Sequence, residues 1–275
     1  MTAPDRYAVF GNPIAHSKSP FIHARFAEAT GQALRYDALL APVDGFAQAV
    51  ADFQAAGGRG ANVTVPFKLD AFALADTRSP RAEAAGAANT LVFAEQGIHA
   101  DNTDGIGLVR DLAWLGAPIE GRRVLLLGAG GAARGVILPL LEAGPRELVI
   151  ANRTQGKAEE LATRFANAGP IRAGGFDSLQ GSFDLVINAT SSSLSDAAPD
   201  LPADVYAAGA LAYDMMYGKT ETAFLMAARA LGASRLADGL GMLVEQAAES
   251  FALWRGVRPD TTPVRAALRD MLAAS

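Results

Sequence analysis

The sequence predicts an α/β protein of two domains. A glycine-rich turn at residues 128–132 follows the apolar run 124–127 directly and opens a stretch rich in helix-forming residues through Leu141. Short apolar segments alternate with helix-like segments along most of the chain, which is the order typical of α/β domains. At 275 residues the chain is longer than one small core requires, so two domains are the natural expectation.

The glycine-rich turn predicts a phosphate-binding site. A strand, a tight turn and a helix in this order direct backbone N–H groups and the positive end of the helix dipole toward an anion. Gly128 permits the turn, Gly130 lets the backbone approach a pyrophosphate, and Ala133 keeps the third position small. This order is typical of a Rossmann-type dinucleotide-binding unit. Because glycine-rich turns also end ordinary buried strands, the motif alone leaves a structural role open.

The next expected strand, 147–151, indicates which dinucleotide is bound. It ends at Asn152, Arg153 and Thr154, where NAD enzymes usually carry an acidic residue for the ribose hydroxyl. Arg153, Thr154 and Lys157 instead suit a 2′-phosphate, so the chain is expected to use NADP. The alternative is a solvated helix start, but cations at a helix N-terminus oppose its dipole. The missing carboxylate also argues against a methyltransferase-type cofactor, S-adenosylmethionine.

Composition excludes several classes of protein. With 24 basic and 29 acidic residues, the net charge of -5 gives no general attraction to nucleic acid. Charged residues interrupt every apolar run, so no membrane span is expected, and the first residues do not resemble an export signal. The absence of cysteine excludes disulfides and thiolate chemistry. We therefore expect a soluble, cytoplasmic protein that binds neither nucleic acid nor membrane.

The remaining segments suggest how the domains are arranged. The expected strands are 6–10, 36–40, 60–65, 87–93, 97–100, 124–127, 147–151, 183–188 and 210–214. The expected helices cover 21–30, 44–56, a segment after Gly105, the segment up to Leu141, a helix that contains Lys157, and a set from about Gly239 to the end. Because the final helices have no accompanying strand, they are expected to return to the first domain. The predicted substrate-binding and catalytic domain is 1–104 with 240–275, the predicted NADP-binding domain is 105–239, and the active site is expected in the cleft.

The catalytic groups are harder to identify from residue types alone. His16, His23 and His99 are the chain's histidines, and none has a metal-binding spacing, so no metal site is expected. Lys68 follows a strand end, where α/β proteins place their sites, although most lysines are only surface charges. Asp104 lies in a loop dense in Asp, Asn and Thr, a pattern that more often forms a turn. Spacing alone leaves both residues undecided.

Nine short sequence blocks follow one another along nearly the whole chain. The blocks are Gly-Asn-Pro-Ile-Ala-His-Ser-Lys-Ser-Pro (11–20), Asn-Val-Thr-Val-Pro-Phe-Lys (62–68), Asn-Thr (89–90), Asp-Asn-Thr-Asp-Gly (101–105), Gly-Ala-Gly-Gly-Ala (128–132), Asn-Arg-Thr (152–154), Asn-Ala-Thr-Ser (188–191), Tyr-Asp-Met (213–215) and Asp-Gly-Leu-Gly-Met-Leu-Val-Glu-Gln (238–246). In this order, the blocks resemble the shikimate dehydrogenase family. The resemblance implies reversible, NADPH-dependent reduction of 3-dehydroshikimate to shikimate, a step in chorismate and aromatic amino acid biosynthesis.

The same resemblance implies roles for residues around the substrate. Lys68 and Asp104 would be the catalytic pair, with Lys68 acting either as the acid/base or as an electrostatic and positioning group. The remaining substrate-binding residues supply hydroxyl and amide groups. Ser17, Ser19 and Tyr217 would bind the substrate carboxylate, and Thr64, Asn89 and Gln246 would bind its ring hydroxyls.

On the cofactor side, the resemblance adds three residues near the nicotinamide to the turn and to the segment that follows the next strand. The implied set is Gly128, Ala129, Gly130, Gly131, Ala132, Asn152, Arg153, Thr154, Lys157, Thr190, Met215 and Gly239. Met215 could equally be a core filler, and Gly239 a turn glycine. The chain departs from the family by carrying Ala133 where serine is common, and by lacking a proline near the end of 215–222.

Two rival functions stay open. A quinate/shikimate dehydrogenase that uses NAD is disfavoured by Arg153 at the ribose position. A ligand-binding regulator without catalysis is disfavoured because Lys68 and Asp104 are both retained. The expected partner is the small-molecule substrate. No heptad repeat demands association, so a monomer or a homodimer is predicted.

Overall fold

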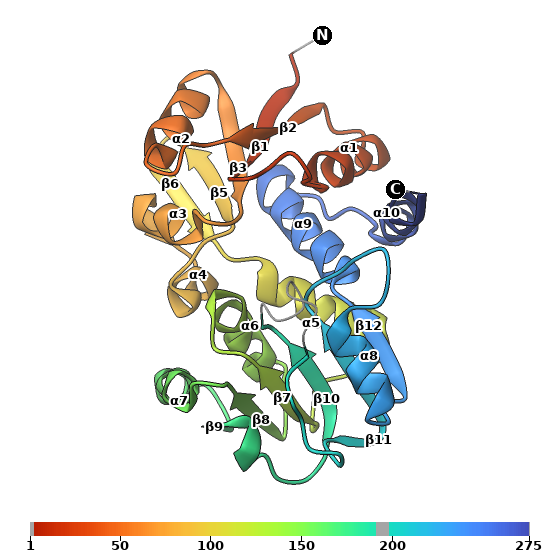
Figure 1. Ribbon diagram of the computed structural model, residues 1–275. Helices are drawn as coiled ribbons and strands as arrows, with labels where there is room; N and C mark the ends of the chain where they lie inside the picture. Colours follow the sequence, from red (N-terminus) through yellow and green to blue (C-terminus); the bar gives the residue numbers. More distant parts are fainter. Residues whose placement is uncertain (1–2, 191–197, 275) are drawn as a thin grey trace. The chain divides into compact units, whose positions relative to one another are not determined.

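The computed structural model describes residues 3–190 and 198–274, and the chain forms two compact units (Figure 1). The first unit is Met1–Gly107 with Val244–Leu268, and the second is Leu108–Leu243 with Arg269–Ser275. The chain thus changes unit after Gly107 and Leu243, where the sequence predicts boundaries after Asp104 and Gly239. The C-terminal segment from Arg269 groups with the second unit, and Arg269 forms an ion pair with both carboxylate oxygens of Asp238 there, at 2.9 and 2.6 Å.

The first unit is built on a mixed sheet. Its elements are β1 (Asp5–Gly11), α1 (Ser19–Thr30), β2 (Leu34–Leu40), α2 (Phe46–Ala55), β3 (Gly58–Val63), α3 (Lys68–Leu74), β4 (Thr77–Arg78), α4 (Pro80–Ala85), β5 (Thr90–Ala94), β6 (Gly97–Asp101), most of α9 (Leu240–Arg255) and the start of α10 (Thr262–Ala274). The strand order is β2-β1-β3-β5-β6-β4, with β5 antiparallel to both β3 and β6. The ends of β1, β3 and β6 and the start of β5 therefore meet at one edge of the sheet.

The second unit is built on a fully parallel sheet. After α5 (Asp104–Trp114), its elements are β7 (Arg123–Leu127), α6 (Gly131–Glu142), β8 (Glu147–Ala151), α7 (Gln155–Arg164), β9 (Ile171–Gly174), β10 (Phe183–Asn188), β11 (Tyr206–Asp214), α8 (Ala223–Ala230) and β12 (Arg235–Asp238). The strand order is β12-β11-β10-β7-β8-β9. The chain leaves β7 toward one side and returns at β10 on the other, so the topological switch point lies between these strands. Ligands of open parallel sheets bind at the carboxyl ends of such strands.

The predicted strand pair at 87–100 and the parallel strands at 183–214 are confirmed by β5 with β6 and by β10 with β11. The prediction that the third strand runs to Val65 is wrong. β3 ends at Val63 because the chain turns at Thr64, whose carbonyl accepts a hydrogen bond from the Phe67 N–H at 3.0 Å. Short elements without a strong apolar period, namely α3, β4, α4, β9, α8 and β12, have no counterpart in the sequence prediction.

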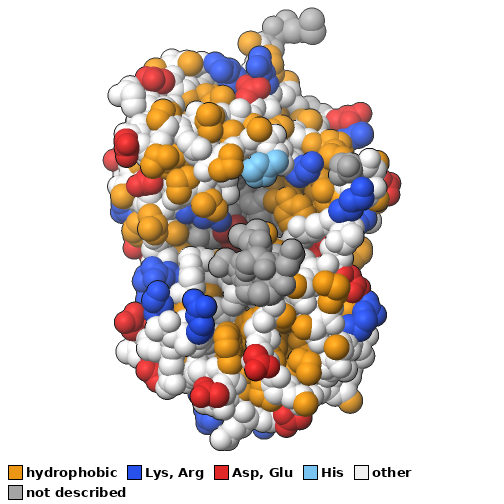
Figure 2. Space-filling model, viewed as in Figure 1, with side chains coloured by type: hydrophobic (Ala, Val, Ile, Leu, Met, Phe, Trp, Pro, Cys, Tyr) orange, Lys and Arg blue, Asp and Glu red, His pale blue; other side chains and the backbone are white. Residues whose placement is uncertain are grey.

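The face drawn in Figure 2 carries Lys, Arg, Asp and Glu side chains interspersed with exposed apolar ones. None of the helices in the described ranges is long and apolar enough to cross a membrane. The same ranges contain no group of three or more His, Asp or Glu side chains arranged to hold a metal ion.

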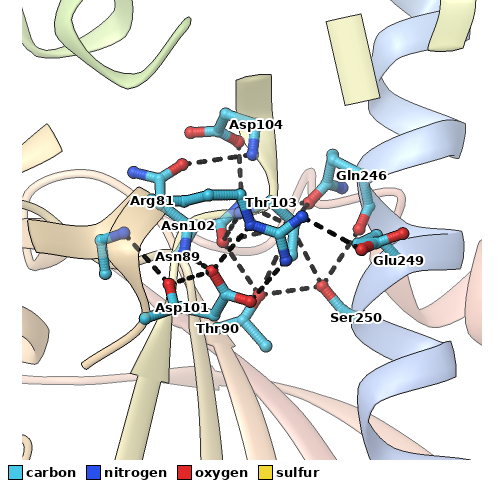
Figure 3. Close-up of polar contacts among 12 residues, drawn as sticks. Arg81, Asn89, Thr90, Asp101, Asn102, Thr103, Asp104, Gln246, Glu249 and Ser250 are labelled. Carbon is cyan, nitrogen blue, oxygen red and sulfur yellow. Dashed lines mark hydrogen bonds and ion pairs between the residues drawn. The ribbon is translucent and has the colours of Figure 1, made fainter. Parts of the chain in front are cut away.

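An ion-pair network attaches α9 to the sheet edge of the first unit (Figure 3). Arg81 on α4 binds both oxygens of Asp101 at the end of β6, at 3.1 and 2.6 Å, and Glu249 on α9 at 3.1 Å. Arg258 then joins Glu249 to Glu245 at 2.9 and 2.6 Å. Burial alone would raise the pKa of Asp101, but hydrogen bonds from Arg81 and Ser79 and the charge of Arg81 hold it below its usual value. Ionised Asp101 is thus part of the native structure.

His23 on α1 is fully buried among aromatic rings. It stacks on Tyr36 with ring centroids 4.2 Å apart and also contacts Phe26, Phe251 and Trp254. Neither ring nitrogen has a hydrogen-bond partner within the described residues. Burial lowers the pKa of His23 from 6.5 to about 3, so the neutral ring belongs to the core of this unit.

Replacing Arg81 should remove the cation that keeps Asp101 ionised. The Asp101 side chain is only 3% exposed, and breaking a buried pair costs about 3–5 kcal/mol. Because the folded pKa of Asp101 is lowered, its ionisation stabilises the protein above the unfolded pKa, and this contribution disappears as pH falls through the folded value. Arg81→Met should therefore lower the free energy of unfolding strongly at pH 7, and this loss should shrink as pH falls below the ordinary pKa of Asp, about 3.9, through the lowered folded value, measured by urea unfolding.

The matched control is Arg25→Met, since the ion pair of Arg25 with Glu28 joins side chains that are 52% and 75% exposed. That change should cost less than about 1 kcal/mol at either pH. Equal losses for the two variants would contradict the structural role of Arg81.

Protonation of His23 should oppose folding in acid. Its pKa is lowered in the folded state to about 3, so the unfolded chain binds the additional proton between pH 6.5 and that value. The stabilisation is present above the unfolded pKa and is lost as pH falls. Relative to His23→Phe, the wild type should lose about 1.4 kcal/mol of unfolding free energy per pH unit between pH 6 and 4. If the unfolding free energies of the wild type and of His23→Phe fell in parallel with pH, His23 would not be the group that titrates. His16→Gln, a change of an exposed histidine, is the control.

Candidate active site and cofactor site

Polar side chains gather where the strands of the first unit's sheet end. Ser17 and Ser19 lie in and just after the loop that follows β1, and Thr64 lies in the turn after β3. The Ser17 hydroxyl accepts a hydrogen bond from the Ser19 N–H at 3.3 Å, while the Thr64 N–H donates to the Phe10 carbonyl at 2.9 Å. Since β1 and β3 are adjacent and parallel, these hydroxyl groups lie at the same edge of the sheet.

Lys68 and Asp104 form the charged pair of this edge. Lys68 is the first residue of α3, Asp104 the first residue of α5, and Lys68 Nζ lies 2.5 Å from Asp104 Oδ2. The side chains are 33% and 16% exposed, so the pair is shielded yet open to a ligand. Asn89 donates to the other carboxylate oxygen, Oδ1, at 2.8 Å. Both carboxylate oxygens are therefore held, which fixes the direction in which the ammonium group is presented.

Asn89 is the centre of a buried hydrogen-bond network (Figure 3). Besides Asp104, its amide nitrogen lies 3.0 Å from Thr103 Oγ1 and 3.3 Å from Gln246 Oε1. Its amide oxygen accepts from the Thr103 N–H and from the Thr90 hydroxyl, both at 2.9 Å. A backbone N–H can only donate and a carboxylate can only accept, so the side-chain amide has one possible orientation.

The network reaches Gln246 because α9 and the first turn of α5 approach closely. Gly107, on α5, makes this approach possible, since a Cβ there would lie 2.8 Å from the Gln246 Cβ and 2.8 Å from its backbone nitrogen. Ser250, one turn further along α9, lies 2.9 Å from Thr90 Oγ1 and accepts from Asn62 Nδ2 at 2.9 Å. The residues that the sequence predicts for catalysis and for ring hydroxyls are thus partly in direct contact with one another.

In the second unit, the glycine-rich turn follows β7 at the switch point. Gly128 has φ +106°, and a Cβ there would lie only 3.1 Å from the Ala189 carbonyl oxygen, so a side chain is excluded. Gly130 and Gly131 have open space where a Cβ would be, and Gly130 caps α6 without a side-chain hydrogen bond. The first N–H groups of α6 have no acceptor within the helix. Together with Ala129 and Ala132, these residues fit a pyrophosphate cradle.

The segment after β8 carries basic side chains at the start of α7. Arg153 and Lys157 are exposed, and neither forms an ion pair with another residue in the described part of the chain. Thr154 is the N-cap of α7, but its hydroxyl makes no capping hydrogen bond. Asn152 is held in place by donating to the Thr154 carbonyl at 2.9 Å. Two cations and one hydroxyl beside a helix N-terminus fit a 2′-phosphate.

Buried polar residues hold the loops after β10 and β11. Asn188 Oδ1 accepts from both the N–H and the hydroxyl of Thr190, at 3.1 and 2.7 Å. Asn188 in turn donates to fully buried Asp214 at 3.1 Å, and Asp214 accepts from the Met216 N–H at 3.1 Å. The Met215 N–H donates to the Asn188 carbonyl at 3.0 Å. These two strand ends are therefore joined into one rigid rim.

Gly239 and Tyr217 flank this rim. A Cβ at Gly239 would collide with the Met215 carbonyl oxygen, so the glycine is required for packing whatever its role in binding. Burial, followed by the negative charge of Asp238, raises the pKa of the Tyr217 hydroxyl. At neutral pH the phenol is thus protonated and can donate a hydrogen bond.

Several residues of these networks were not predicted. Asn188 and Asp214 could have been found, because polar residues directly after two buried parallel strands share a sheet edge. Thr103 stands beside a predicted residue, but nothing in the sequence distinguishes its hydroxyl from others in a polar loop. Ser250 lies four residues after Gln246 and so shares its helix face, which identifies a neighbour without identifying a function. Ser191, in one of the family-like blocks, falls outside the described residues.

Three family models match successive parts of the chain. Residues 9–91 match the shikimate dehydrogenase substrate binding domain, 113–196 match shikimate / quinate 5-dehydrogenase, and 239–269 match the shikimate 5′-dehydrogenase C-terminal domain. A curated relative from Aromatoleum aromaticum, named shikimate dehydrogenase (NADP(+)), is 64% identical over 273 residues and covers 98% of both chains.

Solved structures agree with this relationship. An Ael1 enzyme from Pseudomonas putida superimposes with a TM-score of 0.92 at 56% identity, covering 96% of this chain and 98% of that one. Shikimate 5-dehydrogenase from Thermus thermophilus, solved in complex with NADP(H) and shikimate, has a TM-score of 0.84 at 35% identity over 97% of this chain and 99% of its own. The chain therefore belongs to the shikimate dehydrogenase family.

Proposed function

We propose that this protein catalyses the reversible, NADPH-dependent reduction of 3-dehydroshikimate to shikimate, within chorismate and aromatic amino acid biosynthesis. The observation that carries the proposal is the pair of Lys68 Nζ and Asp104 Oδ2, 2.5 Å apart, with the second carboxylate oxygen held by Asn89. A lysine fixed in this way at a strand edge is suited to proton transfer at a carbonyl oxygen. The names of the relatives support the substrate and the cofactor.

Lys68 carries the proton in this proposal. In the reductive direction the substrate oxygen must gain one proton, and Lys68 Nζ has three N–H donors, of which Asp104 takes one. Another donor can reach the substrate oxygen and stabilise the negative charge that develops there. Asp104 keeps the ammonium oriented throughout. In the oxidative direction the same nitrogen receives the proton, and its 33% exposure allows exchange with water.

Hydroxyl and amide groups would recognise the substrate. Ser17, Ser19 and the protonated Tyr217 hydroxyl would donate hydrogen bonds to the substrate carboxylate. Thr64, Asn89 and Gln246 would bind the ring hydroxyls. Since these are neutral polar groups, an analogue that lacks a hydroxyl would leave one of them unpaired, which disfavours its binding.

The second unit would bind NADP(H). Gly128, Ala129, Gly130, Gly131 and Ala132 would cradle the pyrophosphate at the start of α6. Asn152, Arg153, Thr154 and Lys157 would bind the ribose 2′-phosphate, and Thr190, Met215 and Gly239 would lie at the nicotinamide. When bound, the cofactor supplies the hydride that the substrate carbon gains.

The assignment of the units follows from these sites. The first unit, predicted as 1–104 with 240–275, would serve substrate binding and catalysis, and the predicted segment 105–239 would serve cofactor binding. We further propose a cytoplasmic location. We also propose that the protein is a monomer or a homodimer, and size-exclusion chromatography with light scattering is the direct test of this oligomeric state.

The activity test offers shikimate or quinate, each with NADP⁺ or NAD⁺, and follows nicotinamide absorbance. Reduction of NADP⁺ by shikimate should be much faster than the other three reactions. Preferred turnover of quinate with NAD⁺ would replace the proposal by a quinate/shikimate dehydrogenase. NADPH binding with no turnover at all would favour a catalytically silent regulator.

Removing the Lys68 amine should affect catalysis far more than cofactor binding. Lys68→Ala should lower kcat by about 10²–10⁴-fold, the usual contribution of general acid–base catalysis, while the Kd of NADPH stays within about threefold. Steady-state kinetics and NADPH fluorescence titration measure the two quantities. Asp70→Asn, an exposed change in the same helix, is the control, and near-normal turnover of Lys68→Ala would remove Lys68 from the mechanism.

Arg153 should discriminate between the two cofactors. If its guanidinium binds the 2′-phosphate, Arg153→Ala should weaken NADPH by about 10- to 100-fold and NADH by less than about threefold, since charge-assisted hydrogen bonds contribute about 1.5–3 kcal/mol. The readout is the ratio of the two Kd values. Arg146→Ala, an exposed change just before the other end of β8, should leave the ratio unchanged. Equal losses of affinity for NADPH and NADH would contradict the proposal that Arg153 binds the 2′-phosphate.

A further inference from the structure

Thr103 places one buried hydroxyl between two residues of the proposed substrate site. It precedes Asp104, and its side chain is fully buried. Its Oγ1 lies 3.0 Å from Asn89 Nδ2, from which it accepts a hydrogen bond, and 3.4 Å from Gln246 Oε1, to which it can donate. Thr103 thus joins the β5 edge of the sheet to α9.

The partners of Thr103 restrict which way its hydroxyl points. Asn89 has a fixed amide orientation, because its oxygen faces the Thr103 N–H and its nitrogen faces the Asp104 carboxylate. The Thr103 oxygen therefore receives the Asn89 N–H, and its own proton can go to Asn89 Oδ1, at 3.2 Å, to Gln246 Oε1 or to Ser250 Oγ. Ser250 lies 3.3 Å from the same hydroxyl and supports it from α9.

We propose that Thr103 is a positioning residue that orients Asn89 and Gln246 together and so determines how well the enzyme recognises the ring hydroxyls of its substrate. This inference rests on the proposed function and deepens it. Thr103 is fully buried, so it acts through its neighbours without touching substrate. Its backbone N–H also holds Asn89, but that contact survives a change of side chain, so the hydroxyl can be tested by itself.

The experiment compares Thr103→Val, which keeps the shape but removes the hydroxyl, with Thr103→Ser, which keeps the hydroxyl. With shikimate and NADP⁺, Thr103→Val should raise KM for shikimate by about 5- to 30-fold, the range expected when buried amide groups lose a partner. kcat should change by less, and the Kd of NADPH should stay unchanged. Thr103→Ser should return KM to within about threefold of the wild type.

Substrate analogues distinguish positioning from a general loss of structure. The KM penalty of Thr103→Val should shrink with 4-deoxyshikimate or 5-deoxyshikimate, because the hydroxyl that Asn89 or Gln246 would bind is then missing. A purely structural role would give the same penalty with every analogue and would be mirrored in Thr103→Ser. Thr30→Val removes a hydroxyl that, among the described residues, donates to the Phe26 carbonyl alone, at 2.7 Å, and is the matched control.

Two further measurements keep the inference separate from the proposed function. Side-chain amide NMR signals of Asn89 and Gln246 should shift in Thr103→Val and return in Thr103→Ser, whether or not the protein turns over shikimate. Ser250→Ala should shift the same signals by a smaller amount and provides the test if Thr103→Val fails to fold. An unchanged KM or unchanged amide signals in the Val variant would overturn the inference, whereas a wild type inactive with shikimate would overturn the proposed function alone.

Discussion

The side-chain amide of Asn89 can face only one way, and the arrangement of the polar side chains at the strand ends of the first unit's sheet depends on this constraint. Its oxygen meets the Thr103 N–H at 2.9 Å, and its nitrogen meets the Asp104 carboxylate at 2.8 Å. Reversing the amide would set donor against donor in a buried contact and oxygen against carboxylate in a partly buried one. Asp104 consequently presents its other oxygen to Lys68. The fixed amide of Asn89 therefore orients the Asp104 carboxylate and, through it, the Lys68 ammonium group.

Helix α9 supplies the other side of this site, and both apolar packing of Phe251 and ion pairs hold it against the first unit. Gln246, Glu249 and Ser250 lie on one face because residues three and four apart in a helix are neighbours. Glu249 binds Arg81, which also holds Asp101 just before the loop of Thr103 and Asp104. The ion pairs are worth little as net stabilisation once desolvation is counted. What the structure shows is geometric, since Arg81 holds Glu249 of α9 and Asp101 of the sheet edge on one guanidinium.

In the second unit, too, buried polar side chains at strand ends hold the loops that follow, although the residues differ. Asn188 and Asp214 end adjacent parallel strands, both are fully buried, and they share a hydrogen bond of 3.1 Å. Asn188 Oδ1 accepts from the Thr190 N–H, and the Asp214 oxygen that binds Asn188 also accepts from the Met216 N–H, so both loops are held by their backbone. A buried carboxylate with such partners tolerates few alternative arrangements. In both units, therefore, buried polar groups at strand ends give the loops a defined shape, and the loops present the groups proposed for binding.

The sequence by itself determined the local units: the alternation of strands and helices, the turn at Gly128, and the basic end of β8 at Arg153. These follow from residues adjacent in the chain, because a strand, a turn and a helix place their side chains without help from distant segments. Family resemblance named Lys68, Asp104, Asn89 and Gln246, but spacing alone could not. Only the tertiary structure brought Asn89 to Gln246, 157 positions away, and showed that Gly107, Thr103 and Ser250 lie in contact with this pair or its neighbours. A hydrogen bond depends on distance and direction in space, and those are set by packing between segments whose separation along the chain carries no such information.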